Sequence, residues 1–125
     1  MKLLTIDDSR TIRRVISGVG AMIGYEVLEA EHGAQAMEVL GEHAEEIGLI
    51  LLDWNMPGMN GLEVLQTVKA NPAWAHIPVM MVTTEGEKSY IVKAIQAGAV
   101  HYLTKPFTQE DLAARIMEAM GMGGV

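Results

Sequence analysis

The chain has 125 residues, half of them hydrophobic, and a formal net charge of −7 from 9 basic and 16 acidic side chains. This length fits one domain with one buried core, and the hydrophobic content argues against an intrinsically disordered chain. The acidic balance disfavours a DNA-binding surface, the lack of cysteine excludes disulfides and zinc–thiolate sites, and no apolar run approaches the ~20 residues of a membrane span. The N-terminus does not resemble a signal peptide, so we expect a cytoplasmic protein that binds neither nucleic acid nor a membrane.

Short apolar runs alternate with segments of helical periodicity. The run at 2–7 is followed by a helix that begins at Ser9 as N-cap, stops at Gly24 and carries a one-sided apolar stripe of Ile12, Val15, Ile16, Val19 and Ile23. A second run at 26–30 precedes a helix marked by Ala36, Met37 and Leu40. The third run, 48–52, is continuously apolar, which is typical of a strand buried on both faces.

The second half of the chain repeats this pattern. Turn residues at 55–61 lead to a helix marked by Leu62, Leu65 and Val68, and Asn71-Pro72 ends it. A strand at 78–83 then precedes a helix that carries Ile91 and Ile95 and stops at Gly98. A strand at 100–104 and a helix marked by Leu112, Ile116 and Met120 follow, and residues 121–124 are expected to form a frayed tail.

Five strand–helix pairs in strict alternation predict an α/β fold. We expect one five-stranded parallel sheet with helices on both faces, joined by right-handed crossovers. The natural arrangement is the flavodoxin-like (βα)5 order 2-1-3-4-5. No repeat, linker or second domain is visible, so residues 1–125 are predicted to form a single domain.

Polar side chains stand where four of these apolar runs end: Asp7 and Asp8, Asp53, Thr83, and Lys105. Ligands bind at this edge of an open parallel sheet, and the first and third strands are neighbours in the expected order. Two carboxylates ~4 Å apart repel by ~4 kcal/mol at an effective dielectric near 20, so the cluster must take up a proton, bind a cation or lie beside a base. Each residue alone has an ordinary structural explanation, such as a solvated helix start for Asp7-Asp8. Only their joint placement distinguishes a functional site from such ordinary positions. Because Mg²⁺ prefers oxygen ligands and bridges carboxylates to phosphate, we predict a Mg²⁺ (or Mn²⁺) site with Asp53 as covalent phosphoryl acceptor.

Four motifs carry a resemblance that covers residues 2–120. They are Asp7-Asp8-Ser9, Asp53-Trp54-Asn55-Met56-Pro57, Val82-Thr83-Thr84-Glu85 and Tyr102-Leu103-Thr104-Lys105-Pro106-Phe107. With them the chain resembles the receiver domain of two-component response regulators, and within that family the single-domain chemotaxis regulators. The resemblance implies a phosphorylation-activated signalling switch that takes a phosphoryl group from the phosphohistidine of a sensor histidine kinase. Its altered surface, roughly residues 87–120, would then bind a protein such as a flagellar motor switch protein or a phosphatase.

The resemblance also implies a role for each site residue. Asp8, Asp53 and the backbone carbonyl of Asn55 would ligate Mg²⁺, with Asp7 acting mostly through a bound water. Lys105 would contact the phosphoryl oxygens, and its peptide bond to Pro106 would be cis. Thr83 would move toward the phosphoryl group, and Tyr102 would rotate inward into the space that Thr83 leaves.

Three residues are expected to set the lifetime of the phosphorylated state. In the family, the positions of Asn55 and Glu85 border the path of the hydrolytic water. Thr84 is bulkier than the alanine often found there in chemotaxis regulators, so it would narrow access to Asp53. Away from these residues, Arg10, Arg13 and Arg14 are expected to form a solvated basic patch on the first helix, and Trp54 to pack beside the site and report on it by fluorescence.

Other functions stay open at this point. A Mg²⁺-dependent phosphatase with an aspartyl-phosphate intermediate would need an acid where this chain has Asn55. A flavodoxin would bind a phosphate at its first loop, where Asp7-Asp8 would repel one. A degenerate receiver that acts only as a scaffold would not need the intact set of site residues. Within the receiver family, a single-domain phosphorelay shuttle and a receiver cut from a larger response regulator are alternatives to chemotaxis, and in each the chain catalyses only its own phosphorylation and dephosphorylation.

Overall fold

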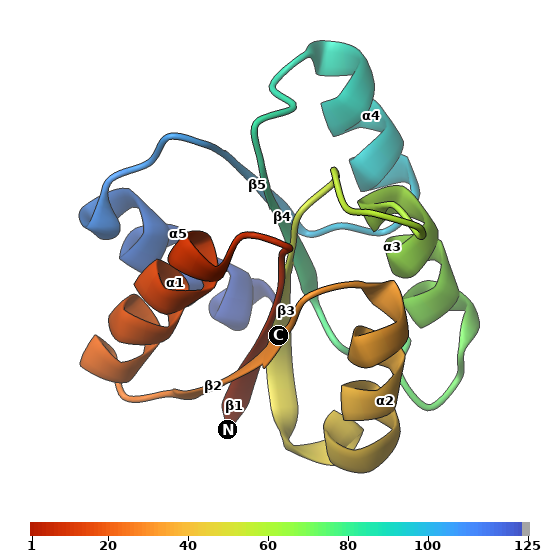
Figure 1. Ribbon diagram of the computed structural model, residues 1–125, viewed down its shortest axis with the longest axis horizontal. Coiled ribbons are helices and arrows are strands. Elements are labelled where there is room, and N and C mark those ends of the chain that lie inside the picture. The colour runs from red at the N-terminus through yellow and green to blue at the C-terminus, as the bar shows by residue number, and fades with distance from the viewer. Residues whose placement is uncertain (124–125) are drawn as a thin grey trace.

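Five parallel strands form one sheet in the order β2-β1-β3-β4-β5 (Figure 1), in a computed structural model that describes residues 1–123. The strands are β1 (Lys2–Ile6), β2 (Glu26–Ala30), β3 (Ile47–Leu52), β4 (Val79–Thr83) and β5 (His101–Thr104). The helices are α1 (Arg10–Met22), α2 (Gly33–His43), α3 (Gly61–Ala70), α4 (Lys88–Gln96) and α5 (Gln109–Gly123), with a short 3₁₀ helix, η1 (Ala44–Glu46), after α2. The predicted α/β class and strand order are confirmed.

Helices cover the sheet on both sides, with α1 and α5 on one face and α2, α3 and α4 on the other (Figure 1). Strand β3 shows how the two faces are filled, because side chains of a strand point to alternate faces. Leu49 and Leu51 join the core under α1 and α5, whereas Ile50 and Leu52 join the core under α2, α3 and α4. The continuous apolar run therefore marks a central strand that is buried on both faces.

Three details differ from expectation. In α4 the buried residue is Ala94, while Ile95, one of the two isoleucines that marked this helix in the sequence, is half exposed. Helix α5 continues through Gly123, where a frayed tail was expected from Gly121; Gly124 lies outside the described residues. The strands also begin or end up to one residue from their predicted bounds, within the range over which assignments of element ends vary. No helix among residues 1–123 is both long and apolar enough to cross a membrane.

Candidate functional site

Backbone hydrogen bonds at the carboxyl ends of the strands bring the predicted site residues to one edge. Asp53 N–H donates to the carbonyl of Ile6 at 2.9 Å, which ties the end of β3 to the end of β1. Lys105 N–H donates to the carbonyl of Thr83 at 2.8 Å, which ties the end of β5 to the end of β4. Each of these donors lies directly after a strand, so the ladder sets the positions of the residues that follow it.

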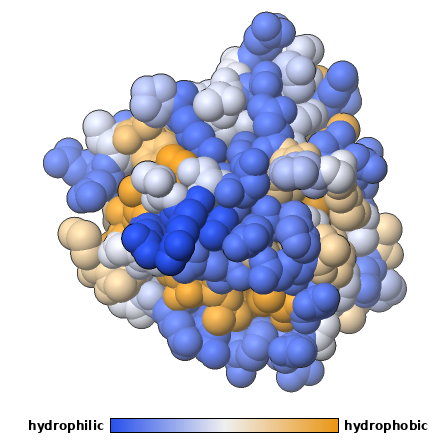
Figure 2. Space-filling view, in the orientation of Figure 1, coloured by the Kyte–Doolittle hydropathy of each residue, from blue (hydrophilic) through white to orange (hydrophobic). Residues whose placement is uncertain are grey.

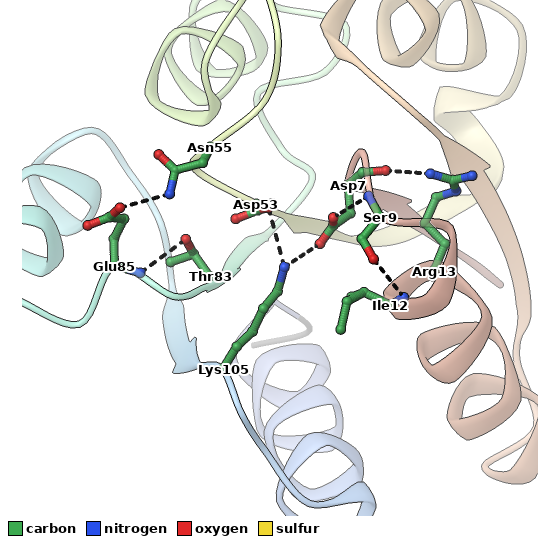
Figure 3. Close-up of polar contacts among 9 residues, drawn as sticks. All are labelled: Asp7, Ser9, Ile12, Arg13, Asp53, Asn55, Thr83, Glu85 and Lys105. Carbon is green, nitrogen blue, oxygen red and sulfur yellow. Dashed lines mark hydrogen bonds and ion pairs between the residues drawn. The ribbon is translucent and has the colours of Figure 1, made fainter.

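The ammonium of Lys105 bridges two buried carboxylates (Figure 3). Its Nζ lies 2.7 Å from Asp7 Oδ2 and 3.3 Å from Asp53 Oδ2, and all three side chains are at least 88 % buried. Burial raises the pKa of Asp7, and the hydrogen bond from Lys105 opposes that rise. The other oxygen of the acceptor candidate, Asp53 Oδ1, is buried and has no hydrogen-bond partner among the described residues.

Three carboxylates converge at this edge. Asp7, Asp8 and Asp53 each present an oxygen atom within 4.8 Å of the others, with Asp8 exposed and the other two buried. These are hard oxygen donors, the kind of ligand that Mg²⁺ and Ca²⁺ take. One lysine cannot balance three carboxylates, so the unpartnered Asp53 Oδ1 and the donor set both fit a divalent cation.

The loop between β1 and α1 holds Asp7 by a second contact. Ser9 N–H donates to Asp7 Oδ1 at 2.9 Å, and the hydroxyl of Ser9 accepts from Ile12 N–H at 3.3 Å as the N-cap of α1. The predicted N-cap is confirmed. The same short segment therefore begins the helix and orients the first carboxylate of the site.

A second group of polar residues lies beside the acidic cluster (Figure 3). Asn55 Nδ2 donates to Glu85 Oε1 at 2.8 Å, and Glu85 N–H donates to Thr83 Oγ1 at 3.3 Å. The hydroxyl of Tyr102 donates to the backbone carbonyl of Glu85. Burial raises the pKa of Tyr102 to about 12, so its hydroxyl stays protonated and able to donate. Thr84, the third residue expected to set lifetime, is exposed.

Trp54, the residue directly after the acceptor candidate, is buried against α4. The residue is 7 % exposed, and its ring meets the ring of Tyr90 in α4 edge to face, with centroids 4.8 Å apart. A Cβ at Gly61 would collide with the backbone of Asp53 and Trp54, and Gly61 N–H donates to the carbonyl of Trp54 at 2.8 Å. Only glycine allows α3 to begin this close to the strand end that carries the site.

One residue of the site was misjudged from the sequence. Arg13 was expected in a solvated patch with Arg10 and Arg14, but it is 6 % exposed, and its Nη1 donates to the backbone carbonyl of Asp7 at 2.7 Å. The patch prediction is therefore wrong for Arg13, whereas Arg10 and Arg14 are exposed. Arg13 lies three residues before the buried Ile16, so helical periodicity does place it on the inner face of α1.

Comparison with known proteins agrees with this arrangement. The family model described as the response regulator receiver domain matches residues 3–117. The chain belongs to this receiver-domain family. The predicted cis peptide bond between Lys105 and Pro106 is also present.

Close relatives of this receiver domain are chemotaxis proteins. A chemotaxis protein CheY homolog of Campylobacter jejuni is 43% identical over 124 residues, which cover 98% of this chain and 95% of the relative. Chemotaxis protein CheY1 of Helicobacter pylori strain J99 is 44% identical over 97% of this chain and 98% of the relative. The crystallised chemotaxis protein CheY4 of Vibrio cholerae superposes with a TM-score of 0.88 at 31% identity and covers 94% of this chain and 97% of its own. This chain is thus a CheY-like receiver domain of the chemotaxis type, a signalling protein.

Proposed function

We propose that residues 1–125 act as a single phosphorylation-activated receiver domain in which Asp53 accepts the phosphoryl group. One observation carries this proposal: the Lys105 ammonium holds Oδ2 of a buried Asp53, while Oδ1 has no partner among the described residues. A buried carboxylate oxygen without a partner is costly in a structural role, and it is the atom that a metal or a phosphorus would engage.

The phosphoryl transfer needs no acid or base from the chain. An oxygen of Asp53 attacks the phosphorus of a kinase phosphohistidine, the P–O bond forms as the P–N bond breaks, and the electron pair returns to the imidazole nitrogen. Asp7, Asp8, Asp53 and the carbonyl of Asn55 would hold Mg²⁺, with Asp7 acting mostly through a water. The bound cation supplies charge neutralisation for the attacked phosphoryl group.

Lys105 has two tasks in this scheme. It neutralises part of the carboxylate charge in the resting site, where its Nζ contacts both Asp7 and Asp53. After transfer it would contact the phosphoryl oxygens, which bring about −1.5 to −2 of new charge. The ammonium is then drawn from Asp7 toward the phosphoryl group.

The new charge would act on Thr83 and, through Glu85, on Tyr102. Among residues 1–123 the hydroxyl of Thr83 accepts a hydrogen bond only from Glu85 N–H, so it could donate its own proton to a phosphoryl oxygen. Movement of Thr83 would pull on the segment whose carbonyl binds the hydroxyl of Tyr102, and Tyr102 would settle inward. This local electrostatic event would bias the surface formed by α4, β5 and α5, which a partner protein then binds.

Loss of the signal would follow from hydrolysis. Water attacks the phosphorus, the P–O bond to Asp53 breaks, and the carboxylate and inorganic phosphate are released. Asn55 and Glu85, which bond to one another at 2.8 Å, would border the path of this water, and the exposed Thr84 would narrow its access.

The chemotaxis relatives indicate which proteins this switch would bind. The CheY relatives from two organisms match nearly the whole chain at 43–44% identity, which supports a cytoplasmic role between a sensor histidine kinase and a flagellar motor switch protein or a phosphatase. A phosphorelay shuttle is the second candidate, and the lifetime of the phosphorylated form separates the two.

The test uses the fluorescence of Trp54 in a Trp74→Phe background, which leaves one tryptophan beside the site. Mg²⁺ is added first and acetyl phosphate second, and Asp53→Asn serves as the matched control. We expect a Mg²⁺-dependent change on adding acetyl phosphate that reverses as the donor is consumed, and no such second change in Asp53→Asn.

Each outcome has one meaning. A signal that decays in seconds supports chemotaxis, and one that lasts many minutes favours a relay. Acid-labile labelling that persists in Asp53→Asn would move the acceptor to another residue. A folded wild-type protein that responds to neither addition would be a scaffold rather than a working receiver.

A further inference from the structure

Arg13 binds the backbone of the acidic cluster from the side opposite to Lys105 (Figure 3). Its Nη1 donates to the carbonyl oxygen of Asp7 at 2.7 Å, and its Nε donates to Glu29 Oε1 of β2 at 3.0 Å. Its Nη2 lies 3.7 Å from Glu31 Oε1, and its side chain is 7 % exposed. The guanidinium therefore joins three elements: helix α1, strand β2 and the loop after β1.

The acceptor of this bond has a special place in the chain. The Asp7 carbonyl belongs to the peptide group that links Asp7 to Asp8, so its direction fixes ψ of Asp7 and φ of Asp8 together. The neighbouring N–H of Asp7 is held by the carbonyl of Ala30 at 3.1 Å. With its N–H and its carbonyl both held, the backbone of Asp7 cannot turn, and the peptide group that leads to Asp8 cannot flip, without breaking a buried, charge-assisted hydrogen bond.

The ion pair with Glu29 explains why an arginine can be buried here. A buried guanidinium is tolerated only when its donors are paired, and a planar fork can serve a carboxylate and a carbonyl at the same time. Ser17 Oγ donates to the second oxygen, Glu29 Oε2, at 3.4 Å. Glu29 is 40% exposed, so this pair orients Arg13 more than it stabilises the fold.

We infer that Arg13 is a positioning residue for the cation site: it fixes the Asp7–Asp8 peptide group so that both carboxylates meet Asp53 before the metal binds. The inference rests on the proposed function, because it assumes that this cluster binds Mg²⁺. It predicts that losing Arg13 weakens Mg²⁺ binding although Arg13 touches no ligand atom of the metal. Outer residues that orient metal ligands change metal affinity by about 10- to 100-fold in other proteins.

The experiment measures the Kd for Mg²⁺ by calorimetric titration of the folded protein. Arg13→Met removes the guanidinium and with it the bonds to Asp7 and Glu29, and Arg13→Lys keeps the charge but cannot serve Asp7 and Glu29 with one planar group. Arg14→Met is the matched control, because it removes the same charge from an exposed neighbour on the same helix. We expect Kd to rise about 10-fold in Arg13→Met, by a similar or smaller factor in Arg13→Lys, and by less than about 2-fold in Arg14→Met.

A second readout separates positioning from a merely structural role. The rate of phosphorylation by acetyl phosphate should fall in Arg13→Met at low Mg²⁺ and return to the wild-type rate at saturating Mg²⁺. A variant that is only less stable would lose unfolding free energy in urea but keep the wild-type Kd for Mg²⁺, and that result would overturn the inference.

The remaining outcomes are equally decisive. Wild-type affinity in Arg13→Lys with a weakened Arg13→Met would reduce the effect to charge and overturn the positioning role. If Arg13 variants do not fold by circular dichroism, Glu29→Gln decides: a raised Kd supports the inference and an unchanged Kd refutes it. Failure of the wild-type protein itself to bind Mg²⁺ would refute the proposed function, which distinguishes that failure from a failure at Arg13.

Discussion

Replacing Asp8 by asparagine should stabilise the metal-free fold and at the same time reduce the stabilisation that Mg²⁺ brings. The substitution removes one of three carboxylates whose oxygens lie within 4.8 Å of one another and keeps the size of the side chain. Two unit charges at that separation repel by about 3.5 kcal/mol at an effective dielectric near 20 and by about 0.9 kcal/mol in bulk water. Asp8 is exposed, so the lower figure is closer to its repulsion from each of the two other carboxylates. Summed over both, we expect the free energy of unfolding in EDTA to be about 1–2 kcal/mol higher in Asp8→Asn than in the wild-type protein.

With Mg²⁺ present the order of the two proteins should reverse. At a concentration about 100 times its Kd, a ligand that binds only the folded state adds about 2.7 kcal/mol to the free energy of unfolding. A variant whose Kd is about 100-fold weaker gains only about 0.4 kcal/mol under the same conditions. The wild-type protein should then become more stable than Asp8→Asn by up to about 1 kcal/mol.

Urea unfolding followed by circular dichroism, in EDTA and in Mg²⁺, measures all four free energies. Glu38→Gln is the control, because it removes one exposed negative charge from α2. An Asp8→Asn protein that is no more stable than wild type in EDTA would show that the carboxylates do not repel one another appreciably. An equal gain from Mg²⁺ in both proteins would show that Asp8 is not a ligand.

Further predictions concern the interior of the site and of the sheet. The hydroxyl of Thr5 is fully buried and has no partner among the described residues, so Thr5→Val should raise the free energy of unfolding by about 1 kcal/mol, and a loss would reveal a hidden partner for that hydroxyl. Lys105→Ala should abolish most of the Trp54 response to acetyl phosphate. It should not weaken Mg²⁺ binding, because it removes a cation from the site. Loss of Mg²⁺ binding in calorimetry would mean that Lys105 and the carboxylates divide their roles differently. Burial raises the pKa of Asp7, so its contribution to stability is full below its unfolded pKa and is lost as the pH rises through the folded pKa. In EDTA the wild-type protein should therefore lose stability relative to Asp7→Asn as the pH rises from the acidic range to neutrality, and a difference between the two that does not change with pH would contradict this.

Much of the site could be predicted because parallel strands end at a common edge. Asp7, Asp53, Thr83 and Lys105 are placed by the ends of apolar runs, and the runs are visible in the sequence. The strand order 2-1-3-4-5 did not follow from the residues alone, since it was taken from the known order of flavodoxin and CheY. Alternation of strands and helices alone would have allowed other parallel orders.

Two residues show what periodicity within one helix leaves undecided. Periodicity places Arg13 on the inner face of α1, yet a buried arginine is possible only if acceptors from elsewhere surround it, and those acceptors are Glu29 and the Asp7 carbonyl. Ile95 helped to predict the helix α4, but it is half exposed, and the tertiary packing of α4 buries Ala94. In both cases the partner lies on another element, which periodicity within one helix cannot reveal.

The sequence by itself determined the alternation of elements, the buried central strands and the residues available for chemistry, because these depend on local periodicity and on where each strand ends. The tertiary structure alone decided which polar atoms are paired: that Lys105 bridges Asp7 and Asp53, that Asp53 Oδ1 has no partner among the described residues, and that Arg13 holds the Asp7–Asp8 peptide group. Hydrogen bonds depend on distances of a few tenths of an ångström between elements that are far apart in the chain, and only the packing of the whole domain fixes those distances.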